Sequence, residues 1–176
     1  VKDVRCGWRH TVCITSLGHV MSWGDNSRGQ AGTSEGHVRK LPQFIDKFIK
    51  RPATQIACGD FFTLVLTKQN VLYGFGNATS GELANEQSFT IGFESVPRVL
   101  ESVMLQTKLV SHISAGSEHA CAVSVDGSVW CWGSCEHGEL GNYSLAGEEA
   151  VYIPSRISLP GEFSKTFCGQ TFSMFV

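Results

Sequence analysis

The chain has 176 residues, of which 42% are hydrophobic and 17% are charged, so it is long enough to bury a core of its own. No segment approaches the roughly 18–20 consecutive apolar residues that a membrane-spanning helix needs. The net charge of −2 lacks the basic excess that phosphate contacts require. We therefore expect neither a membrane nor a nucleic acid as its direct partner.

Seven cysteines are scattered along the chain, and this odd number argues against a secreted disulfide framework. Two Asn-x-Ser/Thr tripeptides, at Asn77 and Asn142, point toward secretion, but such short patterns often arise by chance. We therefore predict a reducing, intracellular compartment, either cytoplasmic or nuclear.

An internal repeat organises the chain. Three segments beginning near residues 6, 58 and 115 align without gaps, and a fourth begins near residue 168. In each complete unit a lead glycine is followed 17 residues later by a second glycine, which is followed five residues later by a third. Because the units account for nearly every residue, we predict that residues 1–176 form a single repeat domain. The lead glycines are Gly7, Gly59, Gly116 and Gly169.

Each unit predicts short strands separated by turns. Its first apolar segment is rich in β-branched residues, and the strand that follows the next turn ends on an aromatic-glycine pair. The repeated glycines predict backbone that lies in a tight turn or packs too closely for a side chain. In chain order, these elements are 11–15 and Trp23-Gly24, 63–67 and Phe75-Gly76, and 120–125 and Trp132-Gly133.

The longer connectors 33–54, 85–112 and 142–165 each carry a further strand that is marked by a proline. Within the first connector, apolar residues at 44, 45, 48 and 49 predict a turn or two of helix.

A four-stranded unit of about 50 residues cannot bury both faces of its sheet alone and needs a neighbour on each side. Radial repetition of such units gives a β-propeller. The third unit, SAGSEHACAVSVDGSVWCWGSCEHGELG, resembles a repeat of the regulator of chromosome condensation family, whose members are typically seven-bladed propellers. The other units depart from this pattern: Phe62 stands where the family's histidine is found, Ala31 replaces a leucine and Ala84 replaces a glycine.

The predicted fold class is therefore all-β, with three blades and part of a fourth of a seven-bladed ring. Three blades and a fraction cannot close such a ring, so we expect a longer chain. The resemblance implies a last blade completed by strands from the start of the chain, which would place Val176 near the native C-terminus. An internal fragment is the alternative.

Cysteine and histidine in the third unit suggest a metal site, because Cys131, Cys135 and His137 lie within seven positions. Their spacing matches no standard zinc signature, so we predict no metal. Cys6, Cys58 and Cys168 share one repeat position with an alanine, which predicts a packed layer of small side chains.

His10 and His119 also share a repeat position, and a recurring histidine favours a scaffold role over a general base. We expect their imidazoles to bond a neighbouring backbone carbonyl, while Phe62 and Phe172 fill the same slot. The sequence contains no Gly-x-Ser-x-Gly elbow, no phosphate-binding loop and no zinc-deaminase signature. We therefore predict a protein without catalytic or cofactor-binding residues of its own.

The turns after the lead glycines occupy equivalent places and would line one face of a ring, next to the loops after the aromatic-glycine pairs. Aromatic and arginine side chains on rigid turns are typical of the residues that dominate protein–protein binding. The loop residues Asp25, Asn26 and Arg28 are expected to be exposed as well. The candidate partner-binding residues are Trp8, Arg9, Asp60, Phe61, Glu118, Glu136 and His137.

The leading functional hypothesis is a non-enzymatic scaffold for protein–protein interaction. The family resemblance adds an alternative, a guanine-nucleotide exchange factor for a small GTPase. The motif of Trp132, Gly133, Glu136, His137 and Gly138 resembles a second branch of the family. For that branch the resemblance implies an accessory subunit that partners a small zinc- or iron-binding protein in tRNA wobble-uridine modification and diphthamide synthesis.

Overall fold

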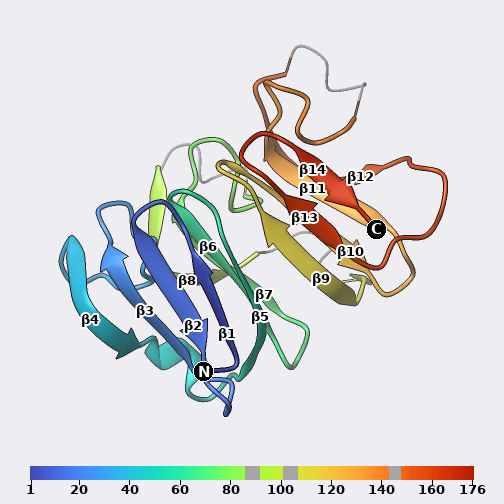
Figure 1. The fold of residues 1–176 in the computed structure, drawn as a ribbon. Coiled ribbons are helices and arrows are strands. Elements are labelled where there is room, and N and C mark those ends of the chain that lie inside the picture. The colour runs from blue at the N-terminus through green and yellow to red at the C-terminus, as the bar shows by residue number, and fades with distance from the viewer. Residues whose placement is uncertain (86–91, 101–106, 143–147) are drawn as a thin grey trace.

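The computed structural model describes residues 1–85, 92–100, 107–142 and 148–176, which form antiparallel sheets joined by loops (Figure 1). Three sheets have four strands and the last has two, and the strands of every sheet follow chain order. The first two sheets contain β1 (Asp3–Cys6), β2 (His10–Ile14), β3 (Val20–Asp25), β4 (Val38–Phe44), β5 (Ala53–Cys58), β6 (Phe62–Thr67), β7 (Leu72–Asn77) and β8 (Phe93–Val99). The others contain β9 (Val110–Ala115), β10 (His119–Ser124), β11 (Val129–Ser134), β12 (Ala150–Ile157), β13 (Thr166–Cys168) and β14 (Ser173–Phe175).

The sheets stand side by side with their first strands innermost. β1 contacts β5, β5 contacts β9, and β9 contacts β13. Figure 1 shows the four sheets following one another in chain order, from the N-terminal sheet to the short C-terminal one. These are the successive blades of a β-propeller, so the predicted fold class is confirmed. The apolar segments predicted at 11–15, 63–67 and 120–125 match β2, β6 and β10, the second strand of each blade, to within one residue.

The hydrophobic core lies between blades rather than within any one of them. Val12, Ile14 and Val20 of the first blade pack with Ile56 and Val65 of the second. A second cluster joins the second blade to the third through Phe62, Leu64, Ala122 and Trp132, among others. The middle strand β6 is consequently buried at all six positions, because its sheet has a neighbour on each face.

The aromatic-glycine pairs form a β-bulge at the same place in each complete blade. The pairing of the third strand with the fourth shifts register between Ser22 and Gly24, and the other two blades show the same shift before Gly76 and Gly133. These glycines have φ values of +104°, +110° and +99°, a region that other residues rarely adopt. The strand pairs for two more residues beyond the bulge, and the loop follows directly after them.

The predicted helical segment is a single turn of 3-10 helix, Asp46–Phe48. Its Phe48 is fully buried and meets Tyr73 of the second blade edge to face, with ring centroids 5.4 Å apart. In the part of the chain that the structure describes, no helix has the length and apolar character to cross a membrane.

Candidate functional site

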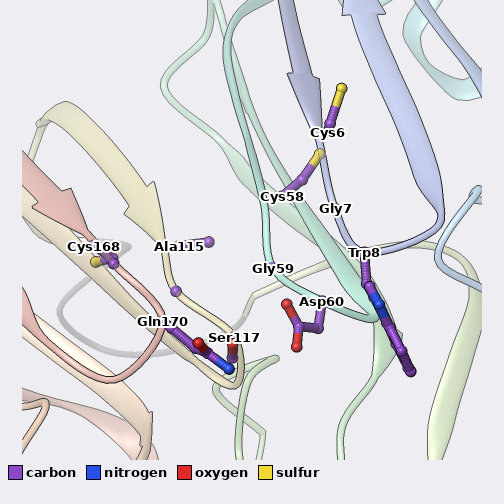
Figure 2. Close-up of a pocket in the computed structure, with 12 residues that line it drawn as sticks. Cys6, Gly7, Trp8, Cys58, Gly59, Asp60, Ala115, Ser117, Cys168 and Gln170 are labelled. Carbon is purple, nitrogen blue, oxygen red and sulfur yellow. The ribbon is translucent and has the colours of Figure 1, made fainter.

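The turns after the lead glycines converge at the inner ends of the blades, around a cavity of about 340 Å³ (Figure 2). Backbone hydrogen bonds join them in sequence: Trp8 N donates to Asp60 O (3.2 Å), Asp60 N to Ser117 O (3.0 Å) and Ser117 N to Gln170 O (3.1 Å). Figure 2 shows the Asp60 carboxylate pointing into the space between these turns. Each blade therefore fixes the position of the next turn through the backbone.

Each lead turn is shaped by a ring that covers its glycine. A side chain on Gly7 would collide with the imidazole of His10 and with the carbonyl of Gly59. The rings of Phe62, His119 and Phe172 cover their own lead glycines in the same way. The lead glycines are therefore required for close packing, as the repeat predicts.

His10 links the first blade to the second through a hydroxyl group. The prediction that its imidazole bonds a backbone carbonyl is wrong for this residue. Its Nε2 lies 2.9 Å from Thr63 Oγ1, which donates its own proton to the carbonyl of Gln30 (2.9 Å). His10 must therefore donate from Nε2, which makes the neutral tautomer with a bare Nδ1. Burial lowers the pKa of His10 to about 4, against a weaker opposing effect of Asp25.

His119 repeats this arrangement between the third blade and the last. Its Nε2 lies 3.0 Å from Ser173 Oγ. Burial lowers its pKa against weaker opposing effects of Glu139 and of a hydrogen bond to the backbone of Phe172, so His119 does have a bond of the expected kind. Both imidazoles are at most 2% exposed, so neither can reach a substrate as a general base. The scaffold interpretation of the two histidines rests on this burial and on the repeated bond.

A buried side chain holds each loop that follows an aromatic-glycine pair, which we did not predict from the sequence. Gln30, Glu82 and Glu139 occupy the same repeat position and are at most 4% exposed. Gln30 Oε1 accepts the backbone N–H of Arg28 (2.9 Å), and Glu82 and Glu139 accept those of Ser80 (2.8 Å) and His137 (2.8 Å). The signal was present in the aligned Gly-Gln-Ala, Gly-Glu-Leu and Gly-Glu-Leu steps.

The same side chains also form a hydrogen bond with the last residue of the strand before the loop, and in each pair a donor meets an acceptor. Gln30 Nε2 donates to Asp25 (3.0 Å), Asn77 Nδ2 donates to Glu82 (2.6 Å) and Ser134 Oγ donates to Glu139 (2.9 Å). Burial raises the pKa of Glu82 despite these bonds. Burial also acts to raise the pKa of Glu139, but hydrogen bonds from its own N–H, Ser134 and His137 outweigh it and lower the pKa.

We call the surface formed by the lead turns and these loops the loop face. It comprises residues 7–9, 59–61, 116–118 and 169–171 together with 25–30, 77–82 and 134–139. The loop and lead turn of one blade are joined directly, since Asp25 N donates to Arg9 O (2.8 Å) and Asn77 N donates to Phe61 O (2.8 Å).

Four of the loop-face side chains form a continuous stack. Trp8, which is 60% exposed, meets Phe61 edge to face with ring centroids 5.1 Å apart. The guanidinium of Arg9 lies 4.7 Å from the centre of the Trp8 ring, and that of Arg28 lies 4.7 Å from the centre of the Phe61 ring. Three segments from two blades thus build one surface, in which two adjacent aromatic rings lie between two guanidinium groups.

The remaining predicted residues lie further along the loop face. Glu118 is exposed and accepts a hydrogen bond from Ser80 Oγ (3.1 Å). Glu136 and His137 are exposed, and His137 Nδ1 lies 3.7 Å from Glu139 Oε1. They do not join the aromatic stack.

Asn26 is not the exposed loop residue that we expected. It is 5% exposed, and its amide donates to the carbonyls of Thr33 and Gly36 (both 2.9 Å) while accepting from Ala31 N (3.0 Å). It therefore holds the loop together from within.

The cysteines lie differently from the expectations in two respects. A disulfide joins Cys121 of β10 to Cys131 of β11, at odds with the predicted reducing compartment, because disulfides persist mainly in oxidising ones. Cys6 is exposed at the rim of the cavity, so a packed layer does not describe it, although burial raises the pKa of its equivalent Cys58 to about 12. Cys135 Sγ donates to the carbonyl of Glu148 (3.1 Å). Among the described residues, no group of three or more metal-ligating side chains is close enough to hold an ion.

The radial meanders, the glycine-packed lead turns and the repeated loops define a β-propeller built from one recurring blade. Two family models confirm the resemblance drawn from the sequence. One description of the regulator of chromosome condensation (RCC1) repeat matches residues 1–30, 53–82 and 110–139, and a second matches residues 18–66 and 126–176. The chain belongs to the RCC1-repeat family.

Solved structures agree on the fold. Prp20p from Saccharomyces cerevisiae, described with its binding to Gsp1p and histones, is 26% identical with a TM-score of 0.82, over 99% of this chain and 43% of that one. Human WBSCR16 is 20% identical with a TM-score of 0.60, over 99% of this chain and 57% of that one, and supports the fold alone.

Curated relatives include proteins named as enzymes. The human E3 ubiquitin-protein ligase HERC2 is 33% identical over 81% of this chain but only 3% of its own length. The mouse serine/threonine-protein kinase Nek9 is 29% identical over 90% of this chain and 16% of its own length. The Arabidopsis thaliana protein RUG3 is 31% identical over 89% of this chain and 35% of its own length. The chain thus spans about a third or less of these relatives.

Proposed function

We propose that this protein is a non-enzymatic propeller scaffold that binds another protein through its loop face. The observation that carries the proposal is the stack of Arg9, Trp8, Phe61 and Arg28, which is exposed yet set on backbone fixed by hydrogen bonds between blades. Exposed tryptophan and arginine on pre-ordered backbone are the residues that most often dominate binding energy, since little conformational entropy is lost on association. The relatives share only this kind of repeat region over small parts of their length, so their ligase and kinase names are not carried over.

Affinity capture with the full-length protein tests the proposal. The partner is first identified by capture and then measured against a variant that carries Trp8→Ala, Arg9→Ala and Glu118→Ala. The matched control carries Leu17→Ala, Lys68→Ala and Val125→Ala, three exposed residues in the hairpin turns of the first three blades, away from the loop face. We expect the first variant to lose capture and the control to retain it. Equal capture by both would refute the loop-face assignment.

Exchange-factor activity is the second candidate function. It draws on the family resemblance and on Prp20p, a similar structure whose description includes binding to Gsp1p. The assay is release of a labelled guanine nucleotide from a panel of small GTPases. Acceleration by the full-length protein supports this function, and release at the intrinsic rate across the panel removes it.

Two further proposals concern the extent of the domain and the cellular location. We propose that residues 1–176 belong to a single domain that continues around a larger ring. We also propose that the protein acts inside the cell, in the cytoplasm or nucleus, as its odd number of scattered cysteines suggests, although the Cys121–Cys131 disulfide argues for an oxidising compartment. A fluorescent fusion of the full-length protein tests the location. The accessory role in tRNA and diphthamide modification depends on the Trp132, Gly133, Glu136, His137 and Gly138 motif alone.

A further inference from the structure

One side-chain contact recurs wherever two complete blades meet on the loop face. The residue 21 positions after a lead glycine contacts the residue two positions after the next lead glycine. At the first junction this pair is Arg28 and Phe61, in a cation–π contact of 4.7 Å. At the second it is Ser80 and Glu118, in a hydrogen bond of 3.1 Å. We call these two contacts the junction pairs.

The backbone beneath each junction pair is fixed from both sides. Buried Gln30 and Glu82 hold the backbone N–H groups of Arg28 and Ser80. Phe61 is held through its own carbonyl, which accepts from Asn77 N (2.8 Å). The frame is therefore constant from junction to junction while the exposed side chains differ. A constant frame with variable side chains is how repeat proteins select partners.

The first junction has positive charge without an ion-pair partner. No ion pair among the described residues includes Arg9 or Arg28. Arg28 Nη1 instead donates to the neutral amide of Asn77 (3.0 Å). The nearest acid along the chain, Asp25, is occupied by bonds from Ser27 N (3.1 Å), Ser27 Oγ (3.0 Å) and Gln30.

Contact with an aromatic ring does not use the N–H donors of a guanidinium, so these donors stay available except for Arg28 Nη1, which already donates to Asn77. A planar guanidinium held over a ring presents its edge to an incoming carboxylate, which it can bind through two hydrogen bonds. The exposed Trp8 ring lies beside Arg9 and offers an apolar surface for a side chain of the same ligand. The first junction thus combines two cations and one apolar platform, while the neighbouring Asp60 carboxylate points into the space between the lead turns.

The second junction has the opposite charge. Glu118 is exposed there, and Glu136 is exposed on the following loop. A polyanion that extended along the loop face, such as a nucleic acid, would meet these carboxylates, and the chain has a net charge of −2. A short acidic segment confined to the first junction would not.

We propose that the first junction, formed by Arg9, Trp8, Phe61 and Arg28, binds a short acidic segment of a partner protein that carries an aromatic or large aliphatic side chain. Glu118 limits the acidic stretch by repelling further carboxylates. This inference rests on the proposed function and names the chemistry of the partner at the same surface.

Selection from a displayed library of random peptides, on the immobilised full-length protein, tests the proposal. We expect selected peptides to be rich in Asp and Glu around an aromatic or aliphatic residue. The variant with Arg9→Gln and Arg28→Gln should bind them about tenfold more weakly or worse, since each lost charge-assisted bond to a carboxylate has that effect. A control with Lys68→Gln and Lys108→Gln, two exposed lysines away from the loop face, should bind them unchanged.

A charge reversal at Glu118 of the second junction tests the proposal independently. Glu118→Lys should leave binding of the short selected peptides unchanged and should tighten several-fold the binding of versions extended by further acidic residues, because it replaces a repelling group by an attracting one at the second junction. Thermal unfolding of each variant checks that the blades remain folded.

The outcomes separate this inference from the proposed function. Neutral or basic selected peptides, or acidic ones whose binding ignores Arg9→Gln and Arg28→Gln, overturn the acidic-segment proposal while loop-face capture of a partner still stands. Tighter binding of a single-stranded oligothymidine than of the selected peptides also overturns it. If capture itself is indifferent to Trp8, Arg9 and Glu118, the proposed function has failed.

Discussion

His10 should make the protein sensitive to mild acid. Its imidazole is 2% exposed between the first and second blades, and its neutral form donates to Thr63. Burial lowers its pKa from 6.5 to about 4, so the folded protein takes up a proton there less readily than the unfolded chain. The stability contributed by neutral His10 is present above pH 6.5 and is lost as the pH falls toward 4.

The size of the effect follows from that shift. A difference of about 2.5 pKa units corresponds to about 3 kcal/mol when the pH lies below both values. At pH 5 the expected loss is about 2 kcal/mol relative to pH 7.5. The matched variant is His10→Phe, because Phe62 and Phe172 already fill the equivalent slot over their own lead glycines. In this variant Thr63 keeps its bond to the carbonyl of Gln30.

Urea unfolding of the wild type and of His10→Phe at pH 7.5 and pH 5 measures the difference directly. Other titrating groups, including His119, are common to both proteins and cancel in the comparison. We expect the wild type to lose about 2 kcal/mol more than the variant over this interval. An equal loss in both proteins would refute the assignment of a buried neutral imidazole.

Three further predictions concern the frame of the loop face and the cysteines. Gly59→Ala should cost about 1–3 kcal/mol in unfolding free energy, because the added carbon would meet the Phe62 ring and the Gly116 carbonyl; an unchanged denaturation midpoint would contradict this packing. Glu82→Ala should cost a similar amount, about 1–3 kcal/mol, by leaving the Ser80 N–H without its acceptor. Glu82→Gln keeps an acceptor oxygen and should cost less, so an equal loss would argue against a role of this hydrogen bond in holding the loop. Cys121 and Cys131 should resist alkylation of the folded protein without reductant while exposed Cys6 reacts, as measured by mass spectrometry, and labelling of all three would disprove the disulfide.

Much of the fold was predictable because the spacing of the glycines reflects the lengths of the turn, hairpin and bulge within each blade. The interval from Gly7 to Gly24 contains one lead turn, a hairpin and a bulge, and an interval of the same length recurs in the next two units. Each of these glycines lies where packing or a positive φ excludes a side chain, so the register survives although the surrounding residues vary. Apolar strands in every unit then required neighbours, which placed the core between blades.

Contacts between blades could not be predicted, since they depend on how neighbouring sheets meet. Thr63 as the acceptor for His10 is 53 residues distant, and no pattern in either strand marks the pair. The disulfide, in contrast, lies within one hairpin and could have been predicted. Cys121 and Cys131 lie opposite each other in the hairpin around Asp126-Gly127, and counting outward from that turn would have paired them.

The candidate site divides in the same way. The positions of Trp8, Phe61 and Glu118 after their lead glycines were enough to place them on one face. The stack of Arg28 on Phe61 was not, because it joins a loop of one blade to a turn of the next. Buried Gln30 and Glu82 were overlooked because polar residues in loops are usually solvated.

Site-specific photo-crosslinking tests the central claim, that the loop face is where a partner protein docks. A photoreactive phenylalanine analogue replaces Trp8 in one sample of the full-length protein and Leu17, an exposed residue in an opposite hairpin turn, in another. The account predicts that irradiation links the captured partner to position 8 and leaves position 17 unlinked. Linkage at position 17 with none at position 8 would contradict it.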